Sequence, residues 1–143
     1  MNKWQADMVK FHEKFGLESI HVPQLPTIAT RLLRISLIEE EVRETVDGIH
    51  RDNLVDIADG IVDSIYVLIG TAVSYGIDLN PLWKEVHRTN MLKDNGPVRG
   101  DGKVLKPEGW QPPRIKELLI KQGADADQFK PIAEDGDEKP ETA

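Results

Sequence analysis

The stretch "LIEEEVRETV", Leu37 to Val46, places four glutamates inside an otherwise apolar segment. Three of them are consecutive, Glu39 to Glu41, and Glu44 follows one turn later. A carboxylate that is buried without a partner is costly and tends to take up a proton instead. The stretch is therefore either the solvated face of a helix or one half of a site that binds a cation.

A helical wheel separates the acidic and apolar side chains of this segment, which is predicted to be a helix from about Thr27 to Ile49. At 100° per residue, Glu40, Glu41 and Glu44 share one broad sector, and Glu39 lies outside it. Two leucines, Leu33 and Leu37, fall within the acidic sector. The opposite side collects apolar residues: Ile35, Ile38, Val42, Val46 and Ile49.

The next predicted helix carries a second acidic sector. It is expected to start at an N-cap of Asp52 or Asn53 and to end at Tyr75. Asp56, Asp59 and Asp63 share one side of it, while the following residues, "SIYVLIGTAVSYG", are nearly all apolar. Because such an apolar helix is usually buried on most sides, its aspartates are expected to be at least partly enclosed.

Two acidic sectors on neighbouring helices predict a site for a divalent cation, since like charges at helical spacing repel each other. The ligands would all be oxygens, because the chain has no cysteine and none of its four histidines lies in the cluster. Such a set suits Mg²⁺ first and Mn²⁺ second. A di-iron site would need a Glu-x-x-His pair on each of two helices, and the four histidines of the chain do not supply two such pairs.

The remaining helices are predicted from their caps. A first helix is expected from Asn2 to Phe15, and a fourth with Asn80 as N-cap and Pro81 at its first position. The Gly/Pro-rich segment that follows contains a tight turn at Asp101-Gly102, and "PPRIKELLIKQG" predicts a short last helix. The expected fold class is all-α: an antiparallel bundle of about four to five helices with a C-terminal Gly/Pro loop and a disordered acidic tail.

Composition divides the 143 residues into one domain and a tail. Residues 123–143 hold seven acids and two lysines and so contribute −5 of the net charge of −7. We expect a domain over 1–122 and disorder over 123–143. With no basic stripe, no signal peptide and no continuous apolar run of about 18 residues, we expect neither nucleic-acid nor membrane binding, and a cytoplasmic location.

The sequence resembles the all-α nucleoside triphosphate pyrophosphohydrolases, the MazG-like and dimeric dUTPase-like superfamily. "EEVRE" matches its E-E-x-x-E motif, and "EVHRTNMLKDNGPVRGDGKVLKPEGWQPP" is similar to the C-terminal half of MazG-like members with dUTPase-type activity. The resemblance covers roughly residues 2–120. It implies Mg²⁺-dependent cleavage of an NTP or dNTP, with dUTP or dCTP expected, to the monophosphate and pyrophosphate. It also implies a homodimer or homotetramer.

The resemblance assigns roles to the carboxylates. It implies metal binding by Glu40, Glu41, Glu44, Asp59 and Asp63, and a catalytic role for Glu41 or Glu44 as the base that activates water. The family follows its first motif with E-x-x-D, whereas this chain has no glutamate there. One alignment places Gly60 at that glutamate and Asp63 at the aspartate, so that Asp59 would substitute; the other uses Asp56 and Asp59. Asp59 and Asp63 are preferred.

Substrate contacts are expected from two other regions. Asn90 offers an amide to a base or sugar, and Lys93, Arg99 and Lys103 place positive charge where phosphates could lie. His12, among the aromatic residues of the first helix, is expected at the nucleoside pocket. For each of these residues, ordinary surface or core packing stays open as the alternative.

Two further hypotheses follow from the missing glutamate and from the apolar helices. The chain could be a helical nucleotide- or metal-binding module without catalysis, or a plain interaction protein that Mg²⁺ does not stabilise. In either case oligomerisation is expected, because four or five helices, one of them nearly all apolar, leave apolar surface that a lone subunit hardly covers.

Overall fold

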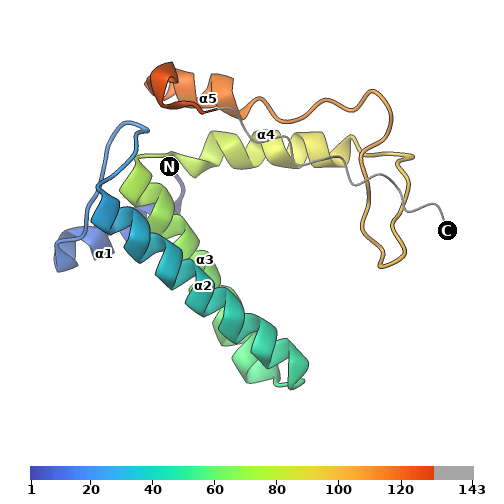
Figure 1. Cartoon of the computed structure of the whole chain (residues 1–143), viewed down its shortest axis with the longest axis horizontal. Coiled ribbons are helices and arrows are strands. Elements are labelled where there is room, and N and C mark those ends of the chain that lie inside the picture. Colours follow the sequence, from blue (N-terminus) through green and yellow to red (C-terminus); the bar gives the residue numbers. More distant parts are fainter. Residues whose placement is uncertain (131–143) are drawn as a thin grey trace.

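The computed structural model describes residues 1–130, and these are all-helical, as the sequence predicts (Figure 1). The helices are α1 (Lys3–Phe15), α2 (Ile28–His50), α3 (Leu54–Tyr75), α4 (Leu79–Met91) and α5 (Ile115–Lys121), followed by a 3₁₀ turn at Ala126–Gln128. The only β pairing in this range is one antiparallel bridge between Val98 and Val104, which closes the hairpin expected around Asp101-Gly102. The predicted tail falls largely on 131–143, outside the described residues.

Capping residues explain most of the helix ends. Asn53 accepts hydrogen bonds from the backbone N–H groups of Val55 and Asp56 at the start of α3, and Gly76 ends that helix with a φ of 70°. The prediction of Asn80 as the cap of α4 is wrong. Asp78 is the cap and accepts from the N–H of Asn80 at 3.0 Å, so α4 begins at Leu79. Pro81 lies in the first turn, where its missing N–H costs nothing.

Helices α2 and α3 form an antiparallel hairpin held by very close backbone approach (Figure 1). At Gly60, an added Cβ would lie 2.6 Å from Thr45 Oγ1 and 2.8 Å from Thr45 Cα. The Thr45 hydroxyl also lies 3.1 Å from the Ser64 hydroxyl. Small residues therefore set the spacing of the two helices at the level of the acidic residues.

A buried arginine holds the other end of the hairpin. Arg34 is 4% exposed, and it donates to the Val67 carbonyl at 2.8 Å and to the Thr71 hydroxyl at 3.1 Å. Helix α1 packs on α3 beside it, and Met8 joins Ile69 and Val73 in the core. This small three-helix junction is the main core of the described residues.

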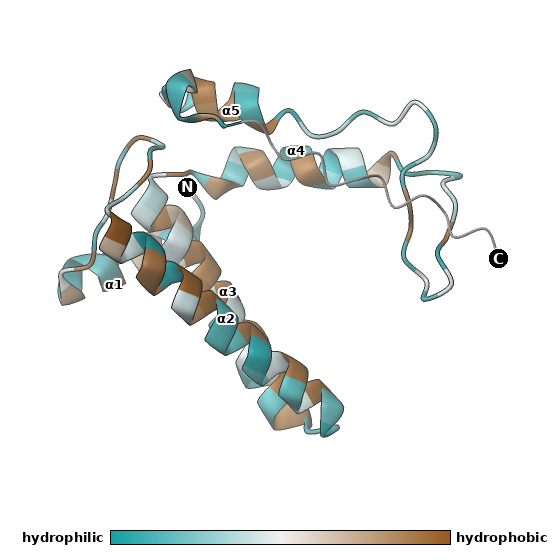
Figure 2. Ribbon diagram, viewed as in Figure 1, coloured by the Kyte–Doolittle hydropathy of each residue, from teal (hydrophilic) through white to brown (hydrophobic). Residues whose placement is uncertain are grey.

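The hairpin has one acidic side and one apolar side, and the apolar side is open (Figure 2). The expectation that α3 is buried on most sides is wrong for the single chain, because Ile61 and Leu68 are 47% and 48% exposed. On α2 the predicted apolar stripe is equally open at Ile35, Val42, Val46 and Ile49. The reason is that α2 turns its small and polar positions, Arg34, Thr45 and Gly48, toward α3.

Helix α3 is long and apolar enough, by length and composition, to cross a membrane. It nevertheless packs along α2 and carries Asp56, Asp59 and Asp63 within its span. Core helices of bundles share these properties, so we treat α3 as the central helix of a bundle.

Residues 79–123 form an arm that leaves the end of α3 at an angle to the hairpin (Figure 1). The elbow is fixed by Gln5, which is 2% exposed: its amide nitrogen donates to the Ile77 carbonyl at 2.5 Å, and its amide oxygen accepts from the N–H of Leu79 at 3.1 Å. Gln122 pairs with the backbone N–H and carbonyl of Asp78 at 2.8 and 2.9 Å. The arm's direction is therefore set by buried hydrogen bonds.

Replacing Gly60 with alanine tests the close helix approach. The new methyl group would overlap the backbone of Thr45, so the two helices must separate and the unfolding free energy should fall by about 2 kcal/mol. Denaturant unfolding of Gly60→Ala measures this loss. Gly100→Ala is the matched control, because nothing lies within 4 Å of a Cβ at that position. Equal stability of the two variants would contradict the packing.

Candidate functional site

Glu41 is the one glutamate of the acidic stretch that points into the hairpin. Its Oε2 atom is buried and has no hydrogen-bond partner among the described residues. Burial raises the pKa of this carboxyl above its ordinary value, and the charges of Asp63, Glu44, Glu40 and Asp59 raise it further. The same five carboxylates that the sequence predicts as metal ligands thus lie within electrostatic range of one another.

The other glutamates lie farther out than the wheel suggests. Glu40 and Glu44 are exposed and border a shallow depression on the outer face of α2. Glu39, predicted to point away from them, borders the same depression. The remaining lining residues are Ser36, Arg43 and Asp47. The predicted sector therefore divides into one inward carboxylate, Glu41, and an outward acidic row.

On α3, the structure distinguishes the three aspartates. Asp56 is engaged at the helix start, where it accepts from Arg51 Nη2 at 3.1 Å and from Asn53 Nδ2 at 2.9 Å. Asp59 and Asp63 instead act on the pKa of Glu41, and Asp63 is half-buried beside α2. Gly60 lies against the backbone of Thr45 with no room for a glutamate. Asp59 and Asp63 are thus the aspartates that face the glutamates.

The carboxylate oxygens of this cluster are the kind of ligand that a hard divalent cation binds. An all-oxygen cluster with one buried, unpartnered carboxylate oxygen is the environment that a divalent ion stabilises. Within residues 1–130, no three acidic or imidazole groups converge on one point. Binding of an ion would therefore require new rotamers for the exposed members, Glu40, Glu44 and Asp59, which solvent leaves room to adopt.

An apolar groove lies between α1 and α3, on the helix that also carries Asp59 and Asp63. Its lining includes two aromatic residues, Trp4 and Tyr66, and the apolar residue Val62, which precedes Asp63. Phe11 packs edge-on against Tyr66 at a centroid distance of 5.5 Å. The aromatic residues of α1 were visible in the sequence, but their junction with Tyr66 was not, because only packing brings the two helices together.

His12, predicted at the nucleoside pocket, lies in the core. It is 0% exposed, and its Nδ1 atom lies 3.1 Å from the Glu18 carbonyl. Burial lowers the pKa of the His12 imidazole. The hydrogen bond with the Glu18 carbonyl partly offsets this by raising the pKa, and the charge of Arg34 lowers it further. In this conformation the side chain has no surface to offer a ligand.

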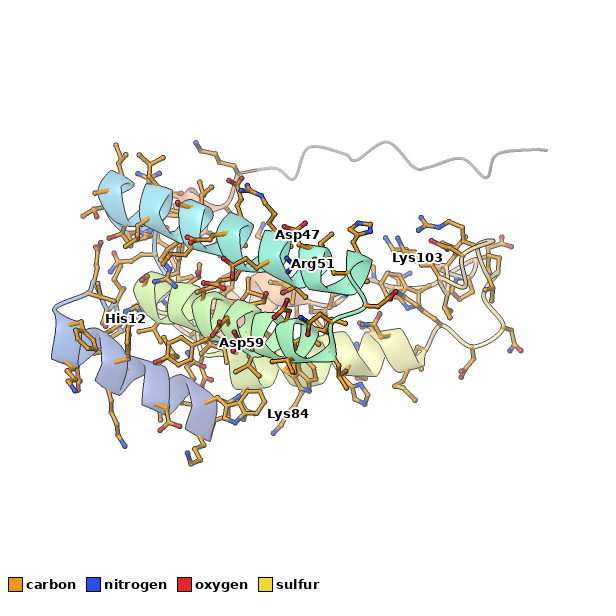
Figure 3. All side chains as sticks on the ribbon, turned by 90° about the horizontal axis from the view of Figure 1, so that it is seen from below. His12, Asp47, Arg51, Asp59, Lys84 and Lys103 are labelled. Carbon is orange, nitrogen blue, oxygen red and sulfur yellow. The ribbon has the colours of Figure 1, made fainter. Side chains whose placement is uncertain are left out.

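The predicted phosphate-binding residues lie on the arm, away from the carboxylates. Lys93 and Lys106 stand over the Trp110 ring, with ammonium-to-centroid distances of 5.2 and 5.4 Å. Trp110 itself donates to the Thr89 carbonyl at 2.7 Å, which ties this cation pair to the end of α4. Figure 3 shows Lys103 at the far end of the arm, well separated from Asp59 on the hairpin.

Two other predicted contacts on the arm have defined surroundings. Arg99 binds its neighbour Asp101 through two nitrogens, at 3.0 and 2.7 Å. Asn90 is exposed in the last turn of α4. The structure thus places the five carboxylates within electrostatic range of one another. It does not bring Asn90, Lys93, Arg99 or Lys103 to them within one chain.

Sequence reasoning missed Glu85, which organises the arm. Its carboxylate is 7% exposed and accepts from Arg88 at 2.8 and 2.9 Å and from the backbone and side chain of Arg114 at 3.1 and 3.2 Å. These hydrogen bonds hold its pKa far below the ordinary value. A glutamate three residues before an arginine was the only local signal, since the contact with Arg114 is long-range.

Comparison with known proteins gives two matches. A family model described as phosphoribosyl-ATP pyrophosphohydrolase matches residues 8–90, which include α2, α3 and every candidate carboxylate. An uncharacterised protein of Acanthamoeba polyphaga mimivirus is 44% identical over 48 residues. That match spans 34% of this chain and 19% of the viral protein, so the shared segment is a small part of the larger relative.

Replacing Glu41 with glutamine should stabilise the metal-free protein at neutral pH. Because the pKa is raised in the folded state, folding favours the protonated carboxyl, and stability falls as pH rises from 4.5 through the folded pKa. Glutamine removes this loss, and we expect Tm at pH 7 to rise, with a smaller difference between the two proteins near pH 4.5. The exposed Glu39→Gln is the control and should leave Tm nearly unchanged. A lower Tm for Glu41→Gln would contradict the assignment.

Proposed function

Because the chain belongs to the phosphoribosyl-ATP pyrophosphohydrolase family, we propose that it is a Mg²⁺-dependent nucleoside triphosphate pyrophosphohydrolase. Family membership supports a pyrophosphohydrolase activity in general. The single observation that carries the specific proposal is the half-buried Glu41, whose Oε2 atom is buried without a partner and within electrostatic range of four other acids. Such a cluster needs positive charge, which divalent ions would supply while they bridge the carboxylates to a triphosphate.

Glu41 is the proposed general base. A base works best when its pKa approaches the working pH, and burial moves the pKa of Glu41 in that direction. The whole set would hold Mg²⁺, or Mn²⁺ in its place: Glu40, Glu41, Glu44, Asp59 and Asp63. When bound, the ions neutralise phosphate charge and lower the pKa of water. The half-buried Asp63 lies on the neighbouring helix, and its negative charge raises the pKa of Glu41 further.

The nucleoside is proposed to occupy the groove between α1 and α3. Tyr66 follows Asp63 by three residues, so its ring lies within one turn of the carboxylates on the same helix. Trp4 provides the second aromatic wall of the groove. An aromatic surface next to a carboxylate cluster would place a base on one side and its phosphates on the other.

Two substrate classes follow from two observations. The E-E-x-x-E motif and the "HRTNMLK" segment resemble dUTPase-type proteins and favour dUTP or dCTP. The family match favours phosphoribosyl-ATP, the compound in the family's description. Both classes would lose pyrophosphate by cleavage of the same kind of phosphoanhydride bond, so one assay compares them.

We further propose a homo-oligomer, a dimer or tetramer, that acts in the cytoplasm. The open apolar side of the hairpin would pack against the same side of a second copy and complete a four-helix layer. Burying the exposed stripes of α2 and α3 would remove a continuous row of apolar side chains from water.

Pyrophosphate release from dUTP, dCTP, other (d)NTPs and phosphoribosyl-ATP tests the activity, with and without Mg²⁺. We expect turnover of at least one of them only with a divalent ion, and a loss of about 100-fold or more in kcat for Glu41→Gln. Asp56→Asn is the matched control, since Asp56 is engaged at the α3 cap. No metal-dependent turnover of any compound would refute the proposal.

The non-catalytic alternative gives a different result in the same experiments. A binding module without catalysis would bind nucleotide in calorimetry and release no pyrophosphate. Turnover that disappears in Glu41→Gln would rule this alternative out.

Light scattering tests the oligomer. We expect a mass of at least two chains for the wild type, because a monomer would leave both apolar stripes in water. Val42→Glu, placed in the middle of the open stripe of α2, should shift the mass toward that of one chain. A monomeric wild-type protein would contradict the proposal.

A further inference from the structure

The arm and the hairpin carry opposite charge. Residues 39–63, the outer half of the hairpin, contain nine carboxylates and two arginines, a formal charge of −7. Residues 84–116 of the arm contain eight basic and four acidic residues, a formal charge of +4. Complementary charge of this size steers two surfaces together and fixes their pairing.

Within one chain these two surfaces stay apart. The elbow is fixed by Gln5 and Gln122 through four hydrogen bonds to the backbone of residues 77–79. Among the described residues, α4 packs on α5, whereas it has no comparable packing with α2 or α3. Figure 1 shows the arm leaving the hairpin at an angle.

The arm also exposes apolar residues that nothing in the described chain covers. Trp83 is 73% exposed and Met91 is 62% exposed, on the same helix that leads to the basic loop. The loop is nonetheless ordered from within, by the Val98–Val104 bridge and by the two lysines that stand over Trp110. An ordered, basic and partly apolar projection is suited to a complementary surface elsewhere.

We propose that the arm of each copy docks on the acidic hairpin of a second copy and adds its lysines to that copy's site. The cation pair Lys93 and Lys106, together with Lys103, would then meet a triphosphate that divalent ions link to the carboxylates of the second copy. The occupant of the arm's docking surface is thus this same chain, and each site is incomplete without it. The catalytic part of this inference rests on the proposed pyrophosphohydrolase function; the docking itself does not.

The chain's lack of cysteine allows a direct test that needs no activity. Glu44→Cys and Lys103→Cys are prepared as separate full-length proteins, mixed, and treated with a flexible bis-maleimide. Because each chain has one thiol, a linked peptide pair that contains positions 44 and 103 can only join two copies. We expect this pair as a main product, and at least a several-fold lower yield when NaCl rises from about 50 to about 500 mM.

Lys121→Cys mixed with Glu44→Cys is the matched control, because Lys121 is an exposed lysine of the arm beside the elbow rather than on the loop. Absence of the 44–103 pair, or a yield no higher than that of the 44–121 pair, would overturn the proposal. Circular dichroism verifies that each variant retains its helices, so that a missing product is not caused by unfolding.

A mixing assay then tests the catalytic part. Glu41→Gln chains and Lys93→Glu/Lys106→Glu chains are each expected to be inactive, and a refolded mixture should regain part of the wild-type rate, since hybrid dimers contain one intact site. If activity does not recover although the 44–103 cross-link forms, the arm docks on the second copy but its lysines do not take part in that copy's site. An inactive wild type with the cross-link present would refute the proposed activity alone.

Discussion

The close approach of α2 and α3 at Gly60 and Thr45 is the constraint on which the rest of the structure depends. With no side chain at position 60, the helix backbones meet, and Glu41, one turn from Thr45, is drawn against the neighbouring helix beside Asp63. A wider hairpin would leave this carboxylate hydrated and of ordinary pKa. The departure from the family's E-x-x-D pattern at Gly60 therefore has a structural cause: the position belongs to the helix interface, and Asp59 and Asp63 remain to face the glutamates.

This packing also explains why a single chain leaves many apolar side chains of α2 and α3 exposed to solvent. Because α2 uses Arg34, Thr45 and Gly48 to face α3, its isoleucines and valines point to the side, where no other described segment covers them. The hairpin thus separates its carboxylates from its apolar stripe and exposes both. A second copy would cover the stripe, and divalent ions would neutralise the carboxylates, so assembly and function would act on opposite sides of the same two helices.

Periodicity and capping predicted the helices well, since both depend on neighbours in the sequence. The all-α class, the ends of α2 and α3 and the turn at Asp101-Gly102 followed from such local signals. The cap of α4 was predicted wrongly, because Asp78 and Asn80 are both residues that cap helices well. Asp78 is the cap in the structure, where Gln5 accepts a hydrogen bond from the N–H of Leu79. A helical wheel contains no contacts between distant segments. It therefore could not predict the burial of His12, the hydrogen bonds of Glu85, or which of the glutamates points into the hairpin.

The central claim is that Glu41 and the carboxylates around it bind a divalent cation. Paramagnetic broadening by substoichiometric Mn²⁺ in an amide NMR spectrum locates the ion without reference to activity. Selective loss of signals from residues 40–45 and 59–64, absent in Glu41→Gln, is the predicted result. Broadening confined to the acidic residues beyond position 123, or spread evenly over all exposed carboxylates, would contradict the account.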